Sequence, residues 1–358
     1  MPIVACVFAC GAAAAGPLEW QVDITPGGEL FPVLDLSQTP AATNGAVGGG
    51  SGLVAIRVSS DARRDLHLRV ETEGLRAEAT VDATIERANT IVELRPRLDW
   101  DRAYLRGLTA PRTQILRVTL ESPGLGVERR DVSVRLHPLD DALYYVREGS
   151  ERVDLSWVFA AYVDPHDAVV DEVLAIARAD SVDIDRPART AADRVHQVRA
   201  VWSALETRGL RYASGDPTLS RGPSIYSQRV RLLSDSWEQR RVNCIDSSVL
   251  IASVLERLGI PGFIVLVPQH AFVGFYTADD RQLPEFLETT VLGSGDEAHT
   301  TQTGPDGFAA ARAAGRARWA RVASKFNGKH RPDFEWIDIP TARANGTLPI
   351  GRDEYADP

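Results

Sequence analysis

The sequence contains little cysteine, lysine or methionine. Among its 358 residues are 3 cysteines and 1 methionine, and its lysines are Lys325 and Lys329. Basic charge is therefore carried almost entirely by arginine, a bias that indicates a GC-rich coding sequence rather than a function. Cys6 and Cys10 lie in an apolar start of the chain that has the character of a secretion leader, so its removal would leave Cys244 alone. In that case neither a disulfide framework nor a cysteine-based zinc site could form.

Positive net charge and long hydrophobic runs are also lacking. The formal net charge is −9 and the pI about 5.4, so neither nucleic acid nor an anionic membrane surface is a favoured partner. Beyond the start of the chain, no segment approaches the roughly 20 continuous apolar residues of a membrane helix. No Gly-rich phosphate loop follows a strand and no haem-attachment motif occurs, which argues against nucleotide, haem and dehydrogenase functions. A composition of 44% hydrophobic and 25% charged residues is typical of globular proteins, and the length allows two domains.

Residues 1–16 are an apolar leader, rich in small residues. Cleavage options lie near Ala13–Gly16, and the segment Val7–Cys10 approximates a lipoprotein box, which would place a lipid on Cys10. The positive n-region of a signal peptide is lacking, so the true start lies further upstream or the segment is only an apolar tail. We expect export, to the periplasm, as a secreted protein or as a lipoprotein, with a cytoplasmic location as the alternative.

Residues 17–150 are predicted to form an N-terminal strand, a linker and a β-domain. The strand is expected at Trp20–Ile24, and Gln38–Gly52 (QTPAATNGAVGGGSG) has no apolar period, which indicates a flexible connector. From 53 to 150 the apolar period becomes two, with turn signals at intervals typical of an immunoglobulin-like β-sandwich, although no Cys…Trp…Cys signature occurs. We see no chemistry in this domain and expect a structural accessory role, with substrate docking as the alternative. The candidate strands are Leu53–Val58, Leu66–Val70, Leu75–Val81, Thr90–Leu94, Ile115–Leu120 and Val132–Leu136.

Residues 151–190 are predicted to be a connecting helical region, and residues 191–358 to form the second domain. The connecting helix is expected to begin at Asp167 or Asp164, and the helix Ala191–Arg208 opens the second domain. The Arg-rich segment Ala309–Ser324 is expected to be an amphipathic helix with a solvated arginine face. Four histidines have no partner pattern and are not expected to bind metal: His166, His196, His299 and His330.

The stretch 242–293 contains the residues that indicate chemistry. From Cys244 onward, apolar residues recur at helical spacing as far as Leu258. Asn243 and Asp246 occupy positions where N-terminal caps belong, and Gly259 is a C-terminal stop. Cys244 is therefore expected to open a buried helix, where the helix dipole and the free N–H groups favour a thiolate and can stabilise an oxyanion.

Two predicted strands after this helix add a histidine and a glutamate. His270 begins the strand His270–Tyr276, and Glu288 lies on the strand Glu285–Leu292. An adjacent strand can hold the carboxylate against the far imidazole nitrogen and fix its tautomer. Each residue by itself is more often structural, as a buried cysteine, a packed histidine or a solvated glutamate. The combination of nucleophile, base and orienting acid in this order indicates cysteine-type acyl transfer.

Other acidic residues are competitors for these roles. Asp246 is expected to cap the helix and not to act as the acid. Glu285, Asp279 and Asp280 are weaker candidates than Glu288 for the third role, because they lie nearer the turn.

An acyl-transfer site also needs a donor that completes the oxyanion hole beside the N–H of Cys244. Gln228 is the favoured candidate and Trp237 the second, with packing or loop hydrogen bonding as the alternative for both. Tyr226 and Phe272 are candidates to line a substrate groove, together with Trp237.

The motifs of this region resemble the transglutaminase-like, papain-related superfamily of bacteria. They are NCID with its helix, GIP at Gly259–Pro261, HAFV from His270 and FLETT from Phe286. The resemblance extends upstream through Val201–Ser214 and Tyr226–Val242, and downstream through Phe308–Val322 and Phe334–Ile350. Two positions depart from the family pattern. Val242 stands where the family has glycine, which narrows the approach to the nucleophile, and Glu288 stands where the family has aspartate.

The resemblance implies an α+β fold: a C-terminal transglutaminase-like (papain-like) domain, preceded by the immunoglobulin-like β-sandwich. It implies a thiol hydrolase or acyltransferase that acts on a protein or peptide, and bacterial members favour hydrolysis by a peptidase or amidase. Cross-linking, in which an amine resolves the acyl-enzyme, is one alternative. A catalytically silent binding or scaffold protein that keeps the fold is the other, and Val242 is the reason to retain it. No metal or organic cofactor is expected, since the chain has no acidic loop with the spacing of a calcium site.

Overall fold

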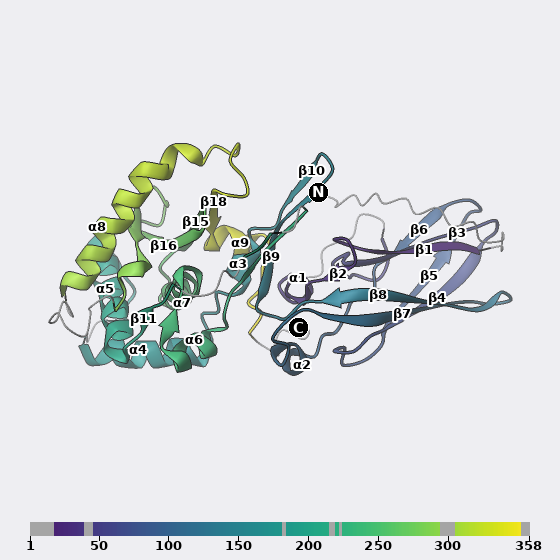
Figure 1. The fold of residues 1–358 in the computed structure, drawn as a ribbon, viewed down its shortest axis with the longest axis horizontal. Helices are drawn as coiled ribbons and strands as arrows, with labels where there is room; N and C mark the ends of the chain where they lie inside the picture. The colour runs from purple at the N-terminus through teal and green to yellow at the C-terminus, as the bar shows by residue number, and fades with distance from the viewer. Residues whose placement is uncertain are drawn as a thin grey trace. The chain divides into compact units, whose positions relative to one another are not determined.

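The computed structural model describes residues 18–38, 46–180, 184–214, 219–221, 224–293 and 305–351. Two compact units compose the chain (Figure 1): unit 1 is Met1–Val153 with Arg221–Ser227, and unit 2 is Asp154–Ser220 with Gln228–Pro358. The connecting region expected at residues 151–190 is therefore assigned largely to unit 2. The predictions on the leader of residues 1–16, with its cleavage site and Cys10, and on His299 lie outside the described residues.

Unit 1 is built mainly from antiparallel β-structure. One sheet has the strand order β1-β3-β6 and another the order β2-β8-β7-β4-β5. A further sheet has the order β10-β9-β13-β12, and through it the segment Arg221–Ser227 joins unit 1, as the hydrogen bond from Arg147 N to Ser224 O shows (2.7 Å). The elements are β1 Leu18–Ile24, β2 Glu29–Leu30, α1 Pro32–Leu36, β3 Val54–Ser60, β4 Arg64–Glu71, β5 Ala79–Ile85, β6 Ile91–Leu94, α2 Arg102–Arg106, β7 Arg112–Ser122, β8 Gly126–Leu136, β9 Asp141–Glu148 and β10 Glu151–Asp154.

The period-two segments of the sequence become strands, with one shift. The strand expected from Leu75 begins only at Ala79, because Leu75 forms an isolated bridge with Trp100 instead. Alternate side chains of β4 are buried, among them Leu66, Leu68 and Val70, as expected for a strand with one face on a core.

The described part of the expected linker is held against β6. Val47 bridges to Leu94, and the N–H of Gly50 donates to the carbonyl of Arg95 at 2.9 Å. A Cβ on Gly50 would lie 2.2 Å from the carbonyl oxygen of Pro96, and one on Gly48 would lie 2.5 Å from that of Arg95. The glycines of residues 46–52 therefore permit a close backbone approach, which corrects the expectation of a flexible connector for this part.

Unit 2 combines helices with one antiparallel sheet of order β17-β16-β15-β18. Helix α7 packs on β15 and β16, and α8 packs on β17. The elements are α3 Val158–Ala161, α4 Ala168–Asp180, α5 Ala191–Arg208, β11 Arg211–Tyr212, α6 Leu233–Gln239, β14 Arg241–Val242, α7 Cys244–Arg257, β15 Gly262–Val267, β16 His270–Tyr276, β17 Pro284–Leu287, the 3-10 helix η1 Thr289–Val291, α8 Pro305–Val322, the 3-10 helix η2 Ala323–Lys325, β18 Glu335–Asp338 and α9 Ile339–Ala344. Strands β12 Leu219–Arg221 and β13 Ile225–Arg229 are divided between the two units.

Local signals account for where the principal helices begin. Thr190 caps α5 in a reciprocal capping box with Asp193, and Gly209 ends it in the left-handed conformation (φ 79°). Asp167 accepts from the N–H of Val169 (2.8 Å) at the start of α4. Of Asp167 and Asp164, the two residues expected to begin this helix, Asp167 is therefore the one that caps it. The strand expected to carry Glu288 is shorter than predicted. It ends at Leu287, so the glutamate lies just beyond the strand and caps η1.

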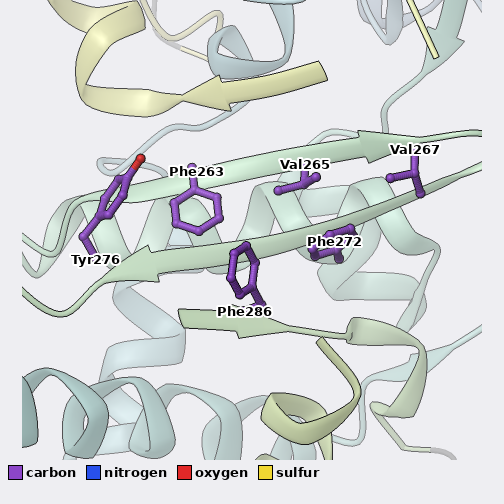
Figure 2. Close-up of a cluster of buried hydrophobic side chains, with 6 residues drawn as sticks. All are labelled: Phe263, Val265, Val267, Phe272, Tyr276 and Phe286. Carbon is purple, nitrogen blue, oxygen red and sulfur yellow. The ribbon is translucent and has the colours of Figure 1, made fainter. Parts of the chain in front are cut away.

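An aromatic core fixes the sheet of unit 2. Figure 2 shows its buried members on β15, β16 and β17: Phe263, Val265, Val267, Phe272, Tyr276 and Phe286. Trp319 of α8 and Trp336 of β18 pack against this cluster. The rings of Phe286 and Trp319 stack with centroids 5.0 Å apart. Helix α8 is thus joined to the strand that leads to Glu288.

Gly274→Ala should destabilise unit 2 strongly. A Cβ there would lie 2.2 Å from Cζ of Phe263 and 2.4 Å from the carbonyl oxygen of Glu285, so the strand pair would have to separate. We expect a loss of about 1–3 kcal/mol in the free energy of unfolding, measured by urea denaturation. Gly262→Ala is the matched control on the neighbouring strand, where the nearest atom would lie at 3.6 Å. Equal losses for the two variants would contradict the close packing at Gly274.

Candidate active site

Cys244 lies at the first position of α7, behind a fully formed N-terminal cap. The side chain of Asn243 accepts hydrogen bonds from the N–H groups of Ile245 (3.0 Å) and Asp246 (2.9 Å). The carboxylate of Asp246 accepts in return from the N–H of Asn243 (3.3 Å), so Asp246 has the capping role expected of it. Cys244 is a free, half-buried thiol at the positive end of the helix dipole.

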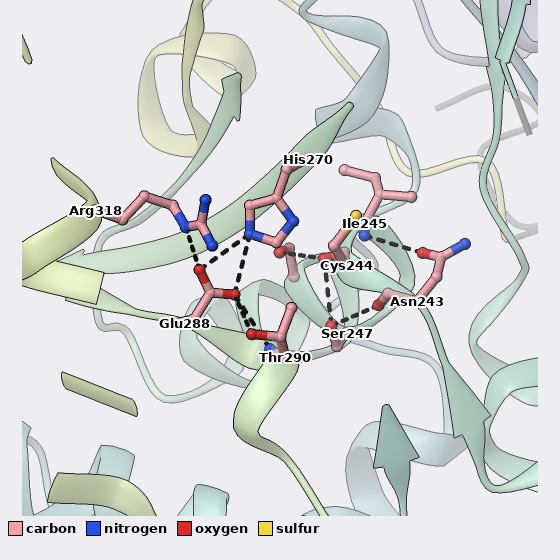
Figure 3. Close-up of polar contacts among 9 residues, drawn as sticks. Asn243, Cys244, Ile245, Ser247, His270, Glu288, Thr290 and Arg318 are labelled. Atoms are coloured by element: carbon pink, nitrogen blue, oxygen red, sulfur yellow. Dashed lines mark hydrogen bonds and ion pairs between the residues drawn. The ribbon is translucent and has the colours of Figure 1, made fainter. Parts of the chain in front are cut away.

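His270, the first residue of β16, is bonded to Glu288. Its Nε2 lies 3.0 Å from both carboxylate oxygens of Glu288. The register that pairs Val273 with Leu287 brings the end of β17 back toward the start of β16, which places the two residues together. Figure 3 shows the imidazole of His270 between Glu288 and Cys244. The Cys244 side chain also acts on the imidazole, because it contributes to the raised pKa of His270.

Two further residues hold the Glu288 carboxylate, which is only 3% exposed. The N–H of Thr290 donates to Oε1 at 3.2 Å, and the Thr290 hydroxyl donates to the same oxygen at 2.9 Å. The Arg318 guanidinium of α8 forms an ion pair with Oε2. A buried carboxylate requires such partners, since desolvation would otherwise make its charged form costly.

The pKa values of the pair move in opposite directions. Burial by itself would lower the pKa of His270, but hydrogen bonds and charge from Cys244 and Glu288 raise it from 6.5 to about 9. Burial would raise the pKa of Glu288, but the bond and charge of His270, with help from Thr290 and Arg318, lower it from 4.5 to about 2. Between these values the pair is an imidazolium and a carboxylate, so the histidine is charged beside the thiol.

The acidic competitors are bound elsewhere. Glu285 forms ion pairs with Arg312 (3.0 Å) and Arg316 of α8. Asp279 pairs with Arg194 of α5, and Asp280 accepts from the N–H of Gln282 (3.1 Å) within the turn. In the described residues the carboxylate that contacts His270 is that of Glu288.

The oxyanion candidates differ in their placement. The indole N–H of Trp237 donates to Glu172 of α4 (2.7 Å) and is thus directed away from the role expected of it. Gln228 is half-buried on β13. Three residues later, the N–H of Arg231 donates to Asp246 in the first turn of α7 (3.0 Å), which ties this segment to the helix of Cys244. Gln228 stays a prediction.

The two groove candidates lie in packed surroundings. Phe272 has no exposed surface and belongs to the aromatic core, with its ring 6.4 Å from that of His270 between centroids, so it does not line a groove. This corrects the expectation for Phe272. The Tyr226 ring contacts those of Tyr144 (6.4 Å) and Tyr145 (5.6 Å) edge-on within unit 1, and Arg147 lies over it at 5.7 Å.

Sequence reasoning missed Tyr212, Thr290 and Arg318. Tyr212 N donates to Leu292 O after η1 (2.9 Å), and Ala213 N donates to Val242 O before Cys244 (2.9 Å). Strand β11 therefore connects the segments that carry the acid and the nucleophile. The Thr-Thr pair that follows Glu288 is the signal of a local cap and could have identified Thr290. No local pattern could have identified Arg318, because its contact depends on the docking of α8.

Within the described ranges, no group of three His, Cys, Asp or Glu residues is arranged to hold a metal ion. His166, His196 and His330 are thus outside any such cluster. No helix in this part of the chain has the length and apolar character needed to cross a membrane.

No family model and no curated protein matches the chain. Among solved structures it is similar to the crystal structure of red sea bream transglutaminase, with 11% sequence identity and a TM-score of 0.23. The match covers 72% of this chain and 53% of the other, so the chain spans about half the length of that protein.

Glu288→Gln should reduce stability in a pH-dependent way. The raised pKa of His270 contributes stability that is complete below pH 6.5 and is lost as the pH rises through about 9. The lowered pKa of Glu288 contributes stability that is complete above pH 4.5 and is lost as the pH falls through about 2. We therefore expect Glu288→Gln to cost about 2 kcal/mol in urea unfolding at about pH 5.5, and less at about pH 9.5.

The matched control for this measurement is Glu285→Gln. Glu285 is paired with arginines, which keep their charge across this range, so its cost should be the same at both pH values. A cost for Glu288→Gln that does not change with pH would contradict a charged imidazolium–carboxylate pair.

Proposed function

We propose that unit 2 is a transglutaminase-like thiol acyltransferase that hydrolyses amide bonds, in the manner of a peptidase or amidase. The observation that supports it is the bond from Nε2 of His270 to both oxygens of Glu288, with the imidazole lying between Glu288 and Cys244 (Figure 3). Nucleophile, base and orienting acid thereby lie next to one another in this order.

The reaction follows from these contacts. The Cys244 thiolate adds to the carbonyl carbon of an amide, forming a C–S bond and an oxyanion. The imidazolium of His270 gives its proton to the amide nitrogen as the C–N bond breaks and the amine leaves. His270, now neutral, takes a proton from water, which adds to the thioester, and the C–S bond breaks to release the acid. Glu288 keeps the ring oriented and stabilises its charged form throughout.

The oxyanion is expected to bind at the N-terminus of α7. The backbone N–H of Cys244 is available at this position, since Asn243 accepts the two N–H groups that follow it. Gln228 remains the proposed second donor, because its segment is tied to the first turn of α7 through Arg231.

Two alternatives use the same fold differently. In cross-linking, a primary amine and not water would attack the thioester. In a catalytically silent binding or scaffold protein, Cys244 would be inert, and the feature in favour of this is Val242, whose side chain is fully buried directly before the capped turn. For unit 1 we propose an accessory role as a β-sandwich of immunoglobulin type, supported by the sheets β1-β3-β6 and β2-β8-β7-β4-β5.

Cys244 should be alkylated rapidly at mildly acidic pH. An ordinary thiol has a pKa near 8.5 and is almost entirely protonated at about pH 6, whereas an imidazolium and a helix N-terminus favour the thiolate. We expect substoichiometric iodoacetamide to label Cys244 at about pH 6 at least 10-fold faster in the folded chain than in the urea-unfolded chain. Mass spectrometry of the Cys244 peptide measures this, and labelling of His270→Ala at an undiminished rate would contradict activation by the imidazole.

The wild-type chain should form an acyl-enzyme with p-nitrophenyl acetate. We expect a burst of p-nitrophenolate stoichiometric with enzyme, followed by slower turnover, and no burst for Cys244→Ser. Adding a fluorescent primary amine tests the alternative, because a cross-linking enzyme would release the acetylated amine in place of acetate. Failure of the wild-type chain to show either the burst or rapid alkylation would favour the silent binding protein.

A further inference from the structure

Helix α8 is docked on the strand that leads to the acid. A Cβ on Gly315 would lie 2.6 Å from the carbonyl oxygen of Phe286, so the helix touches the backbone of β17 there. On either side of this point, Trp319 stacks on Phe286, while Arg312 and Arg316 hold Glu285. The contacts of Gly315 and Trp319 fix the position of the helix along the strand, and with it the position of Arg318.

Arginines of α8 therefore form ion pairs with two different carboxylates, one on β17 and one directly after it. Arg316 pairs with Glu285, which has no contact with His270 among the described bonds, and Arg318 pairs with Oε2 of Glu288. Thr290 holds the other oxygen, Oε1. Each oxygen of Glu288 thus has an anchor of its own, and both lie equally far, 3.0 Å, from Nε2 of His270.

The titratable and charged groups around Glu288 come from four elements. His270 of β16 hydrogen-bonds to it, Cys244 of α7 contributes to the raised pKa of the imidazole, and Arg318 of α8 pairs with its Oε2. Tyr212 of β11 is affected by the same charges. Burial is the largest cause that raises its pKa, the charges of Cys244 and Glu288 raise it further, and the charge of Arg318 lowers it. Arg318 therefore adds positive charge where a carboxylate and a thiolate otherwise surround the imidazole.

A carboxylate bonded to an imidazole can hold the imidazolium too firmly for acyl transfer. The histidine has to give up its proton to the leaving amine and then act as a neutral base toward water. An arginine that shares the charge of the carboxylate weakens this hold, and it keeps the carboxylate in place while doing so.

We propose that Arg318 is a positioning residue for acyl transfer at Cys244: its ion pair with Oε2 holds Glu288 on the imidazole and shares the charge of the carboxylate, so that His270 can release its proton. This proposal rests on the proposed function of unit 2. Arg318 acts through Glu288 and has no contact with the nucleophile among the described interactions.

The test compares Arg318→Gln with Arg316→Gln, a matched change on the same helix that affects Glu285 only. For each chain, Cys244 is alkylated by iodoacetate and by iodoacetamide over a range of pH. The anionic reagent is attracted by the imidazolium and the neutral one is not, so the ratio of the two rates falls as His270 loses its proton. Turnover of p-nitrophenyl acetate after the burst is measured in parallel.

We expect Arg318→Gln to raise the midpoint, the pH at which the ratio of the iodoacetate and iodoacetamide rates is half lost, by about one pH unit. Without the arginine, the whole charge of the Glu288 carboxylate acts on the imidazolium and holds its proton more firmly. Post-burst turnover at about pH 7.5 should fall about tenfold, since the fraction of neutral imidazole falls tenfold, and KM should not change. Arg318→Lys, which keeps the charge, should restore most of the wild-type midpoint. Arg316→Gln should match the wild-type chain.

A midpoint for Arg318→Gln that is the same as for Arg316→Gln, or lower, would overturn the proposal. Should Arg318→Gln lack the circular dichroism of the folded chain, Arg318→Met provides a second neutral side chain for the same comparison. If the wild-type cysteine reacts no faster than in the unfolded chain, the proposed function of unit 2 fails. If the wild-type cysteine is activated and the two arginine variants behave alike, only the role of Arg318 fails.

Discussion

The hydrogen bond from Nε2 of His270 to the Glu288 carboxylate is the interaction on which the candidate site depends. It requires a carboxylate that is 3% exposed to stay ionised, which is stable only because the imidazole, Thr290 and Arg318 all contact it. It also fixes which ring nitrogen is available to Cys244. The chemistry that we propose is a consequence of this one bond and of the capped helix that presents the thiol.

The bond draws distant parts of unit 2 into a single arrangement. Asn243 fixes the first turn of α7, and the β16–β17 register returns Glu288 to His270. Tyr212 of β11 donates to the carbonyl of Leu292, and Ala213, the next residue, donates to that of Val242, so this segment holds the other two together. Since each contact constrains a different element, a displacement of any of these elements would change the position of the imidazole relative to Cys244 or Glu288.

The positions of helices and strands could be predicted better than the contacts of the site. The start of α7 at Cys244, the full extent of α5 and the strand His270–Tyr276 could be predicted from the residues alone. Glu288 was expected within a strand, yet it lies just after one and caps η1, where its carboxylate accepts from the N–H of Thr290. Arginines expected to face solvent on α8 are instead bound to Glu285 and Glu288.

By itself, the sequence determined where α5, α7, β15 and β16 lie, because capping, glycine stops and apolar period act over a few residues. It also determined that a cysteine, a histidine and an acid follow one another on successive elements. Only the tertiary structure decided that Glu288 and not Glu285 meets the imidazole, that Trp237 donates to Glu172, and that Phe272 is buried. These outcomes depend on which surfaces dock, and a contact such as Arg318 with Glu288 joins residues that no local pattern relates.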